Sequence, residues 1–359
     1  MRQDDENRFL DPQNPTMRDV AERAGVATAT VSNVLSGRRA VTPELRARVA
    51  AAIEATGYRP NHLAASLRRA RSQTVGVMVP DLTNPFFAAL VHRLEDLAAE
   101  DGYDIILVGS HEDEAREGAR LQTLLSRQVD GLIIAPARDE IPALRESGSR
   151  LPPTVLMDRG ADNPRFDGVT ADNAEAARQG CRHLIALGHR DIALVVTSPT
   201  LANMRERIAG YQAGLATVGM EGRARIIVGG FDVETCRAAI EQALLRADRP
   251  SAIFAANYVG TLGAMKAIRA MDLDFPGDIS LLAFDDSDWM TVLRPYLSAI
   301  AQPVAAMADA AWRLLQARLV APLAAPRHLC LPCTLAVRES TQRPLVALQE
   351  ELRPVAASS

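Results

Sequence analysis

The chain has 359 residues, of which 48% are hydrophobic and 23% charged, so it exceeds one comfortable core and is too apolar to be disordered. Its N-terminus lacks the apolar stretch of a secretory signal, and no run of about 18 apolar residues could span a membrane. Four scattered cysteines are too few for a disulfide framework. These features predict two or three soluble domains in the cytoplasm.

The net charge of −4 is unevenly distributed along the chain. Residues 1–72 contain 12 arginines and 8 acidic residues, whereas the remainder is acidic. A small basic segment on an acidic body suits an anionic partner for that segment alone.

Three short helices are predicted after a polar, disordered arm at 1–15. The first, "TMRDVAERAG", begins at a Thr16 cap with Asp19 in its first turn and ends at Gly25. One of its faces is apolar and carries Val20, Ala21 and Ala24.

The second helix, "VATATVSNVLSG", is uncharged and built almost entirely from small residues. Its inward face is expected to carry Val31, Val34 and Leu35. A helix of this kind can approach a narrow groove closely, and the major groove of DNA is such a groove.

The third helix, "TPELRARVAAAIEATG", has Thr42 as its cap, Pro43 at its first position and Gly57 at its end. Its apolar stripe is Leu45, Val49 and Ile53. Two helices joined at Gly25, with a third packed across them, form a helix-turn-helix pattern. A simple packing domain is the alternative.

Beyond residue 72, apolar β-branched runs alternate with amphipathic helices, which predicts parallel sheets built from βαβ units. There are too many strands for one ordinary sheet, so we expect two doubly wound subdomains that change over near Asp172 and again near 299–303. The expected strands are "TVGVMVP", "YDIILVG", "VDGLIIAP", "TVLMD", "GVTAD", "DIALVVT", "ARIIVGG", "SAIFAAN", "DISLLAF" and "LSAIAQP".

Motifs in three separate parts of the chain carry a family resemblance. The strings "TMRDVAERAGVATATVSNVL", "GYRPNHLAASL", "VGVMVPDLTNPFFAAL" and "LCLPCTLAVREST" resemble the LacI/GalR family of bacterial transcription regulators, over residues 16–341.

The resemblance implies an α+β multi-domain fold. Its parts are a three-helix DNA-binding head (16–59), a hinge helix and linker (60–72), and a periplasmic-binding-protein-like body (73–344) for effector binding and dimerisation. The body would consist of one subdomain at 73–172 plus 303–330 and another at 173–300 plus 333–344, followed by a tail at 345–359.

The family comparison also implies which residues contact duplex DNA. Thr28, Ala29 and Asn33 would face base edges, and Leu67 of the hinge would wedge into a minor-groove step at the dyad, with Asn61 as the hinge cap. The other expected contacts are Thr16, Met17, Thr30, Ser32, Arg39 and Arg68. A charged linker with Leu67 as a stray core residue is the alternative for the hinge.

A small polar effector would lie between the two subdomains. The residues implied to line its site are Phe86, Phe87, Asp158, Asp172, Asn173, Arg207, Phe231, Asn257 and Asp285. Arg207 and Asp285 are the pair we favour; either Asp158 or Asp172 could instead be a helix cap, and Phe86 could be core.

Several positions depart from the family pattern. Ala27 and Ala29 replace a hydroxyl cap and a long polar side chain, and Ala65 stands where Arg is common. Tyr258 follows Asn257 where sugar-binding members usually have Asp, and Leu201 and Ala202 occupy a loop position that is polar or basic in purine-type members. The effector could therefore be a sugar, a sugar acid or another polar metabolite.

The resemblance leads us to expect a homodimeric regulator, most often a repressor, acting on an operator of two-fold symmetry, with no cofactor and no membrane partner. The CxxC pair Cys330 and Cys333 is expected to be structural rather than a redox or zinc half-site. A transport solute-binding protein would have no use for residues 16–72. An enzyme would need phosphate-binding glycine loops or a catalytic motif, and we find neither.

Overall fold

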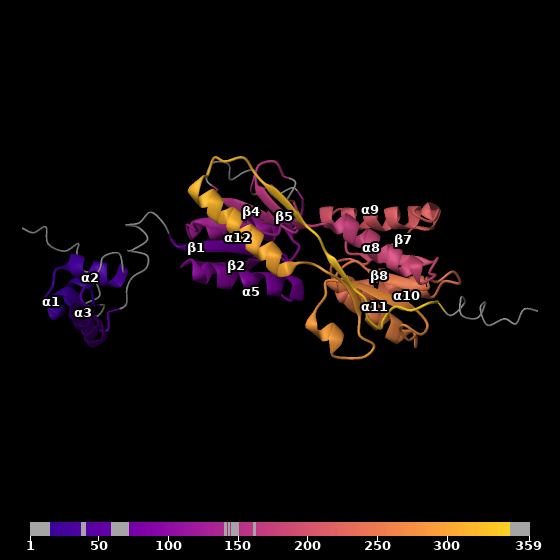
Figure 1. Cartoon of the computed structure of the whole chain (residues 1–359), viewed down its shortest axis with the longest axis horizontal. Helices are drawn as coiled ribbons and strands as arrows, with labels where there is room; N and C mark the ends of the chain where they lie inside the picture. Colours follow the sequence, from indigo (N-terminus) through magenta and orange to yellow (C-terminus); the bar gives the residue numbers. More distant parts are fainter. Residues whose placement is uncertain are drawn as a thin grey trace, which may run out of the picture. The chain divides into compact units, whose positions relative to one another are not determined.

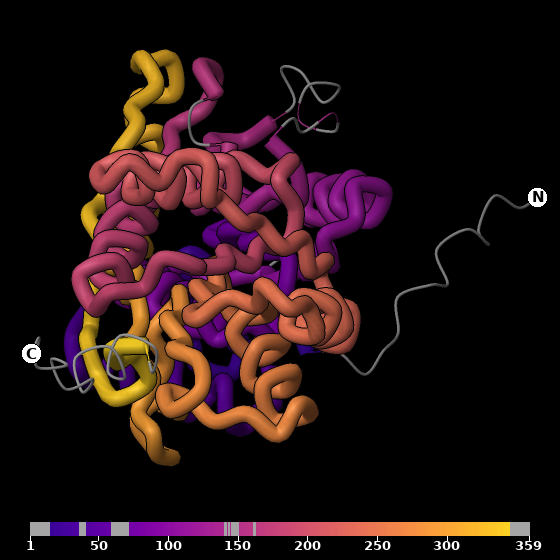
Figure 2. Tube along the Cα trace, turned by 90° about the vertical axis from the view of Figure 1, so that its right-hand side faces the viewer, coloured from indigo at the N-terminus to yellow at the C-terminus, as the bar shows by residue number. Residues whose placement is uncertain are grey.

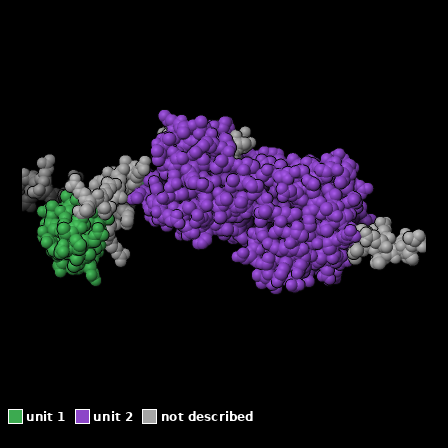
Figure 3. Space-filling view, in the orientation of Figure 1, with its two compact units in different colours: residues 1–72 green, residues 73–359 purple. Residues whose placement is uncertain are grey.

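The computed structural model describes residues 15–36, 41–58, 72–139, 142, 144, 151–160 and 163–344. The chain folds as two compact units, residues 1–72 and 73–359 (Figure 3). Most of the predicted arm, Arg39, the hinge residues up to 71 and the tail at 345–359 lie outside the described residues. No described helix is long and apolar enough to cross a membrane.

The described residues of the first unit form three helices, α1 (Met17–Ala24), α2 (Thr28–Ser36) and α3 (Pro43–Thr56). Helices α1 and α3 begin and end where the sequence predicts. Thr16 and Asp19 form a reciprocal capping box at the start of α1, Thr42 caps α3, and Gly25 and Gly57 end their helices in the left-handed conformation.

The core of this unit combines residues of all three helices, namely Val20, Ala21, Ala24, Val31, Val49 and Ala52. The inward face predicted for α2 is wrong at one position. Val31 is buried and Val34 packs against the core, but Leu35 is 38% exposed. A nine-residue helix on so small a core covers a narrow stripe, and Leu35 lies beyond it.

The second unit contains two six-stranded sheets, each belonging to one subdomain (Figure 1). The first sheet has the order β11-β5-β4-β3-β1-β2 and is parallel throughout. Its strands are β1 (Thr74–Val79), β2 (Asp104–Gly109), β3 (Gly131–Ile134), β4 (Thr154–Met157), β5 (Asp167–Ala171) and β11 (His328–Leu331).

Helices cover both faces of this first sheet. α5 (Pro85–Glu100) and α12 (Val304–Val320) pack on one face, where Val75, Val77 and Val79 point. α6 (Glu114–Ser126) packs on the other face, against Met78 and Leu132. The alternation follows from the two-residue side-chain period of a strand.

The second sheet has the order β12-β10-β9-β8-β6-β7. Its strands are β6 (Ile192–Val196), β7 (Arg225–Val228), β8 (Ala252–Ala255), β9 (Ser280–Phe284), β10 (Ser298–Ala301) and β12 (Thr334–Ala336). The helices α8 (Asn173–Ala186) and α9 (Ala202–Ala216) pack on one face, and α10 (Val233–Leu244) and α11 (Tyr258–Ala270) on the other (Figure 2). Two short 3-10 helices, η2 (Glu221–Arg223) and η3 (Asp288–Thr291), complete this subdomain.

The chain crosses between the subdomains three times. It crosses after β5 at Asp172, between β10 and α12 at 302–303, and between β11 and β12 at 332–333. The expectation of purely parallel sheets is wrong for β12, which runs antiparallel to β10. β12 enters the second subdomain from the crossing, whereas β10 runs toward it, so their directions must oppose.

Candidate functional site

The exposed face of α2 is small and uncharged. Thr28 and Ala29 are exposed, Thr30, Ser32 and Asn33 are half-buried, and the helix carries no acidic or basic residue at either end. A helix with such short side chains can bring its backbone close to base edges, while an amide such as Asn33 can bond adenine and a methyl group can pack on thymine.

The orientation of α2 is set by its neighbours. Arg48 of α3 donates hydrogen bonds to the carbonyl oxygens of Ala24, at 2.7 Å, and Gly25, at 3.2 Å. These bonds fix the turn between α1 and α2. Arg48 therefore has a structural role that the helical pattern did not reveal.

The predicted contacts Thr16 and Met17 lie at the start of α1. The Thr16 backbone amide donates to the Asp19 carboxylate at 2.7 Å and the Thr16 hydroxyl donates to it at 2.8 Å, and these two bonds lower the pKa of Asp19. Met17 packs against the core of the unit. A DNA contact by Thr16 or Met17 stays a prediction.

A cavity of about 140 Å³ lies where the two subdomains meet. Asp158 follows β4 and Thr170 belongs to β5 of the first subdomain, whereas Asn203 and Glu206 belong to α9 of the second. The carboxyl ends of doubly wound sheets are where such folds bind ligands. The lining residues are Asp158, Arg159, Gly160, Thr170, Ala202, Asn203, Glu206, His328, Leu329 and Cys330.

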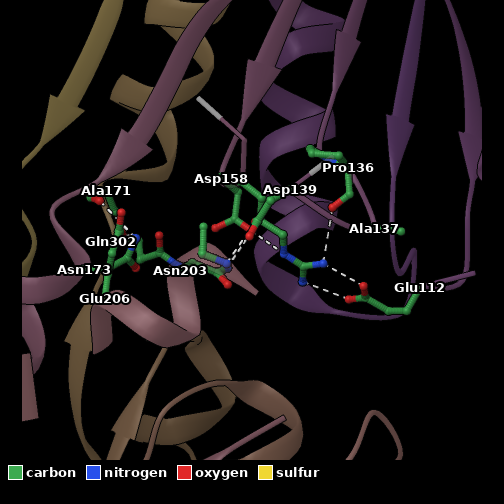
Figure 4. Close-up of polar contacts among 12 residues, drawn as sticks. Glu112, Pro136, Ala137, Asp139, Asp158, Ala171, Asn173, Asn203, Glu206 and Gln302 are labelled. Atoms are coloured by element: carbon green, nitrogen blue, oxygen red, sulfur yellow. Dashed lines mark hydrogen bonds and ion pairs between the residues drawn. The ribbon is translucent and has the colours of Figure 1, made fainter. Parts of the chain in front are cut away.

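Asp158 and Asn203 join the two walls of this cavity (Figure 4). The Asn203 amide donates to Oδ2 of Asp158 at 3.1 Å, and both residues are buried. Asp158 has a positive φ of 63°, a conformation that Asp and Asn tolerate better than most residues.

A second contact between the subdomains involves Asp139. Helix α9 begins at Ala202 and has no side-chain cap of its own, because its N-cap residue is Leu201. Oδ1 of Asp139 accepts a hydrogen bond from the Ala202 amide at 2.9 Å, and Oδ2 lies 2.7 Å from the Arg205 guanidinium. The first subdomain therefore caps a helix of the second.

Arg207, only 2% exposed, is the centre of a buried network beside the cavity. Its Nε donates to Oδ1 of Asn173 at 2.9 Å, and its guanidinium carbon lies 3.6 Å from the centre of the Phe284 ring. Burial raises the pKa of Asp285, while the nearby Arg207 charge and a hydrogen bond from Gln302 act in the opposite direction.

Comparison with known proteins identifies both parts of this arrangement. Residues 16–61 match the family of bacterial regulatory proteins of the lacI family, and residues 181–341 match a periplasmic binding protein-like domain. The HTH-type transcriptional regulator PtxS of Pseudomonas plecoglossicida is 34% identical over 91% of this chain and 95% of its own length. The chain belongs to the lacI family.

Other relatives agree with this assignment. The ribose operon repressor of Escherichia coli K12 is 32% identical over 90% of this chain and 99% of its own. The solved structure of the lac repressor dimer bound to operator and the anti-inducer ONPF is 27% identical, with a TM-score of 0.80 over 92% of this chain and 99% of that one. The lacI-family chain is thus a DNA-binding transcriptional regulator rather than a solute-binding protein, and its relatives are regulators, not enzymes.

The lacI-family structure places the predicted ligand residues in different surroundings. Asp158 lines the cavity, and Asn173, Arg207 and Asp285 form the buried network beside it. Phe86 and Phe87 are buried in the core of the first subdomain, with ring centroids 4.9 Å apart.

Three further predicted residues do not line this cavity. Asp172 caps α8 and Asn257 caps α11, each by accepting a hydrogen bond from a backbone amide, so the capping alternative holds for Asp172. Phe231 is exposed on a turn before α10. A ligand contact by any of these residues, or by Phe86 and Phe87, stays a prediction.

Sequence reasoning missed most of the cavity wall. Of the missed wall residues, Asn203 and Glu206 lie three positions apart on α9, and this spacing of polar residues on a largely buried helix was the available signal. Cys330 also lines the cavity, and Cys333 packs against both cores. Within the described residues, no group of three or more His, Cys, Asp or Glu could hold a metal ion.

Proposed function

We propose that this chain is a homodimeric repressor in the cytoplasm that binds an operator of two-fold symmetry, with a small polar ligand controlling its operator affinity. The observation that carries this proposal is the presence, in one chain, of a small uncharged reading helix and a cavity shared by two subdomains. Relatives named as repressors, one of them solved as an operator-bound dimer, support it. No catalytic step is part of this function.

DNA recognition is assigned to two elements. Thr28, Ala29 and Asn33 of α2 would read base edges, with Thr30, Ser32, Arg39 and the Thr16–Met17 helix end near the backbone. Because α2 offers few long polar side chains, much of the specificity falls to the hinge, where Leu67 would unstack a base step and Asn61 and Arg68 would support it.

Ligand control follows from the position of the cavity. Its walls come from both subdomains, so an occupant that contacts both changes the free-energy difference between open and closed arrangements. In a dimer, such a change alters the separation of the two segments at 63–71 and therefore whether the two hinge helices form together.

Replacing Leu67 with Ala tests the DNA part of the proposal. We expect operator affinity to fall by roughly tenfold or more and nonspecific affinity to change little, because only the specific complex contains the unstacked step. Gel-shift titrations at fixed salt, with the promoter region of the chain's own gene and a random duplex, measure both values.

Leu323→Ala provides the matched control, since Leu323 is 100% exposed on the second unit. An equal loss of affinity on the two duplexes for Leu67→Ala would remove the wedge role. A folded protein with no preference for its promoter region would refute the proposed function.

A further inference from the structure

Helix α2 depends on its neighbours for its position. Apart from Ala29 and Leu35 it consists of Thr, Val, Ser and Asn, which have low helix propensity. Ala27, whose carbonyl oxygen accepts the first helical bonds from Thr30 and Val31, has no side-chain acceptor and cannot cap the helix. At nine residues, α2 is also too short to be stable alone.

The packing of α2 leaves its orientation underdetermined. Val31 is fully buried, and Val34 is a partly buried neighbour of the same core. These two side chains lie on one stripe of the helix, and hydrophobic burial is non-directional, so α2 could roll about that stripe. Helix α3 packs much more extensively on α1 than on α2. The turn that precedes α2 has to supply the remaining constraint.

Arg48 of α3 constrains that turn. Gly25 ends α1 in the left-handed conformation, and the amides of Gly25 and Val26 donate back to carbonyl oxygens of α1. The next two carbonyl oxygens, those of Ala24 and Gly25, accept hydrogen bonds from Nη2 of Arg48 at 2.7 and 3.2 Å. One guanidinium nitrogen thus joins α3 to the end of α1 and to the start of the segment that leads into α2.

The charge and the anchoring of Arg48 strengthen this link. Hydrogen bonds from a charged donor are stronger than neutral ones, and a cation at the C-terminal end of a helix interacts favourably with the helix dipole. The backbone of Arg48 is held in place because the next residue, Val49, is fully buried in the core that the three helices share.

We propose that Arg48 is a positioning residue for DNA recognition, which holds α2 at the angle at which its base-reading side chains meet the major groove, and that it is not a phosphate contact. The inference rests on the reading role of α2 in the proposed function. Base contacts carry sequence discrimination, whereas phosphate contacts add affinity for any duplex. Because contacts of this kind tolerate displacements of only about 0.5 Å, loss of the Arg48 bonds should reduce discrimination.

The test compares Arg48→Gln with the parent protein, in the full chain. Gel-shift titrations at fixed salt give the affinities for the promoter region of the chain's own gene and for a random duplex. We expect the ratio of these two affinities to fall by roughly fivefold or more, which is the discrimination that one base contact provides.

Arg46→Gln is the matched control, because Arg46 is exposed two positions earlier on the same helix and makes neither bond to the turn. It removes an equal charge, so the affinity ratio should stay within about twofold of that of the parent protein. Salt dependence separates the two roles of Arg48. Loss of a phosphate contact lowers the slope of log affinity against log salt by about 0.9, and Arg48→Gln should show less than half of that change on the random duplex.

Partial unfolding of the first unit cannot imitate the expected result. An unfolded head binds neither duplex specifically, so a loss of stability lowers both affinities by the same factor and leaves their ratio unchanged.

Three outcomes would overturn the inference: an unchanged ratio in Arg48→Gln, an equal fall of the ratio in Arg46→Gln, or the full slope change of a lost phosphate contact. A parent protein without promoter preference would refute the regulatory function itself, whereas a preference that survives in Arg48→Gln refutes the positioning role alone.

Discussion

Glu117 of α6 is only 1% exposed, although carboxylates are seldom buried so completely. Its Oε2 accepts a hydrogen bond from the Ala137 amide at 2.5 Å. Ala137 directly follows Pro136, whose carbonyl oxygen accepts a hydrogen bond from Arg159 of the cavity wall. Burial raises the pKa of Glu117 to about 7, and the nearby Glu114 and Glu112 charges act in the same direction. Glu117 therefore gains or loses its proton near neutral pH, at a position next to the cavity wall.

The raised pKa of Glu117 makes the stability of the second unit depend on pH. Because the folded state binds this proton more tightly than the unfolded state, the stabilisation is complete below about pH 4.5 and is lost as pH rises to about 7. We expect the free energy of unfolding of the parent protein to fall by about 3 kcal/mol more than that of the Glu117→Gln variant across this pH range. Urea unfolding at several pH values measures the difference.

The variant Glu95→Gln is the control, because Glu95 is exposed on α5 of the same subdomain. Its stability difference from the parent protein should not vary with pH. If Glu117→Gln behaved in the same way, the pKa of Glu117 would be the same in the folded and unfolded states and burial would not raise it.

At the scale of elements, α8 and α9 approach each other more closely than side chains normally allow. A Cβ atom at Gly210 of α9 would lie 1.9 Å from the carbonyl oxygen of Ala174 on α8, and one at Gly214 would lie 2.7 Å from Cβ of Cys181. Glycine at these positions sets the distance between the two helices. This pair carries Asn173 and Arg207 into contact.

Gly210→Ala should separate the two helices and destabilise the second unit by at least about 2 kcal/mol, because the clash is with backbone rather than with a movable side chain. Chemical unfolding measures this loss. Gly222→Ala is the same substitution at a position with no atom within 4 Å, and it should change stability by less than about 0.5 kcal/mol. Equal effects would show that the close approach is not needed.

Local patterns in the sequence predict elements better than they predict the site. Helix limits at Thr16, Gly25, Thr42 and Gly57 follow from capping and backbone conformation, and all ten expected strands occur as β1–β10. The cavity wall could not be read in this way. Asn203 contacts Asp158 only because the two subdomains bring them together, and their spacing along the chain does not predict that contact.

The direction of β12 and the exposure of Leu35 were unpredictable for a related reason. Both depend on what surrounds a short segment rather than on its own residues. β12 has only three residues, and its direction is set by the crossing from β11. Leu35 is apolar, but the first unit has no further surface to cover it within the described residues.

At the scale of the whole second unit, Asp139 links the subdomains through the start of α9. Asp139→Ala should leave the Ala202 amide without its cap, at a cost of about 1 kcal/mol. Hydrogen exchange at the first turn of α9 should then be roughly fivefold faster, as that free energy implies, while exchange in α11 stays unchanged. Asp139→Asn keeps an acceptor oxygen and should restore most of the protection; failure to do so would assign the effect to the Arg205 ion pair instead.

The three crossings between the subdomains lie close together, because β11 pairs with β5 and β12 pairs with β10 (Figure 1). A protease that cuts one of them leaves the two halves attached by the other two, so a nicked molecule should migrate intact under native conditions and split only in denaturant. Neither half is a continuous stretch of the chain, and for that reason no single truncation yields either half alone. A mutation that alters one half must therefore be studied with the other half present.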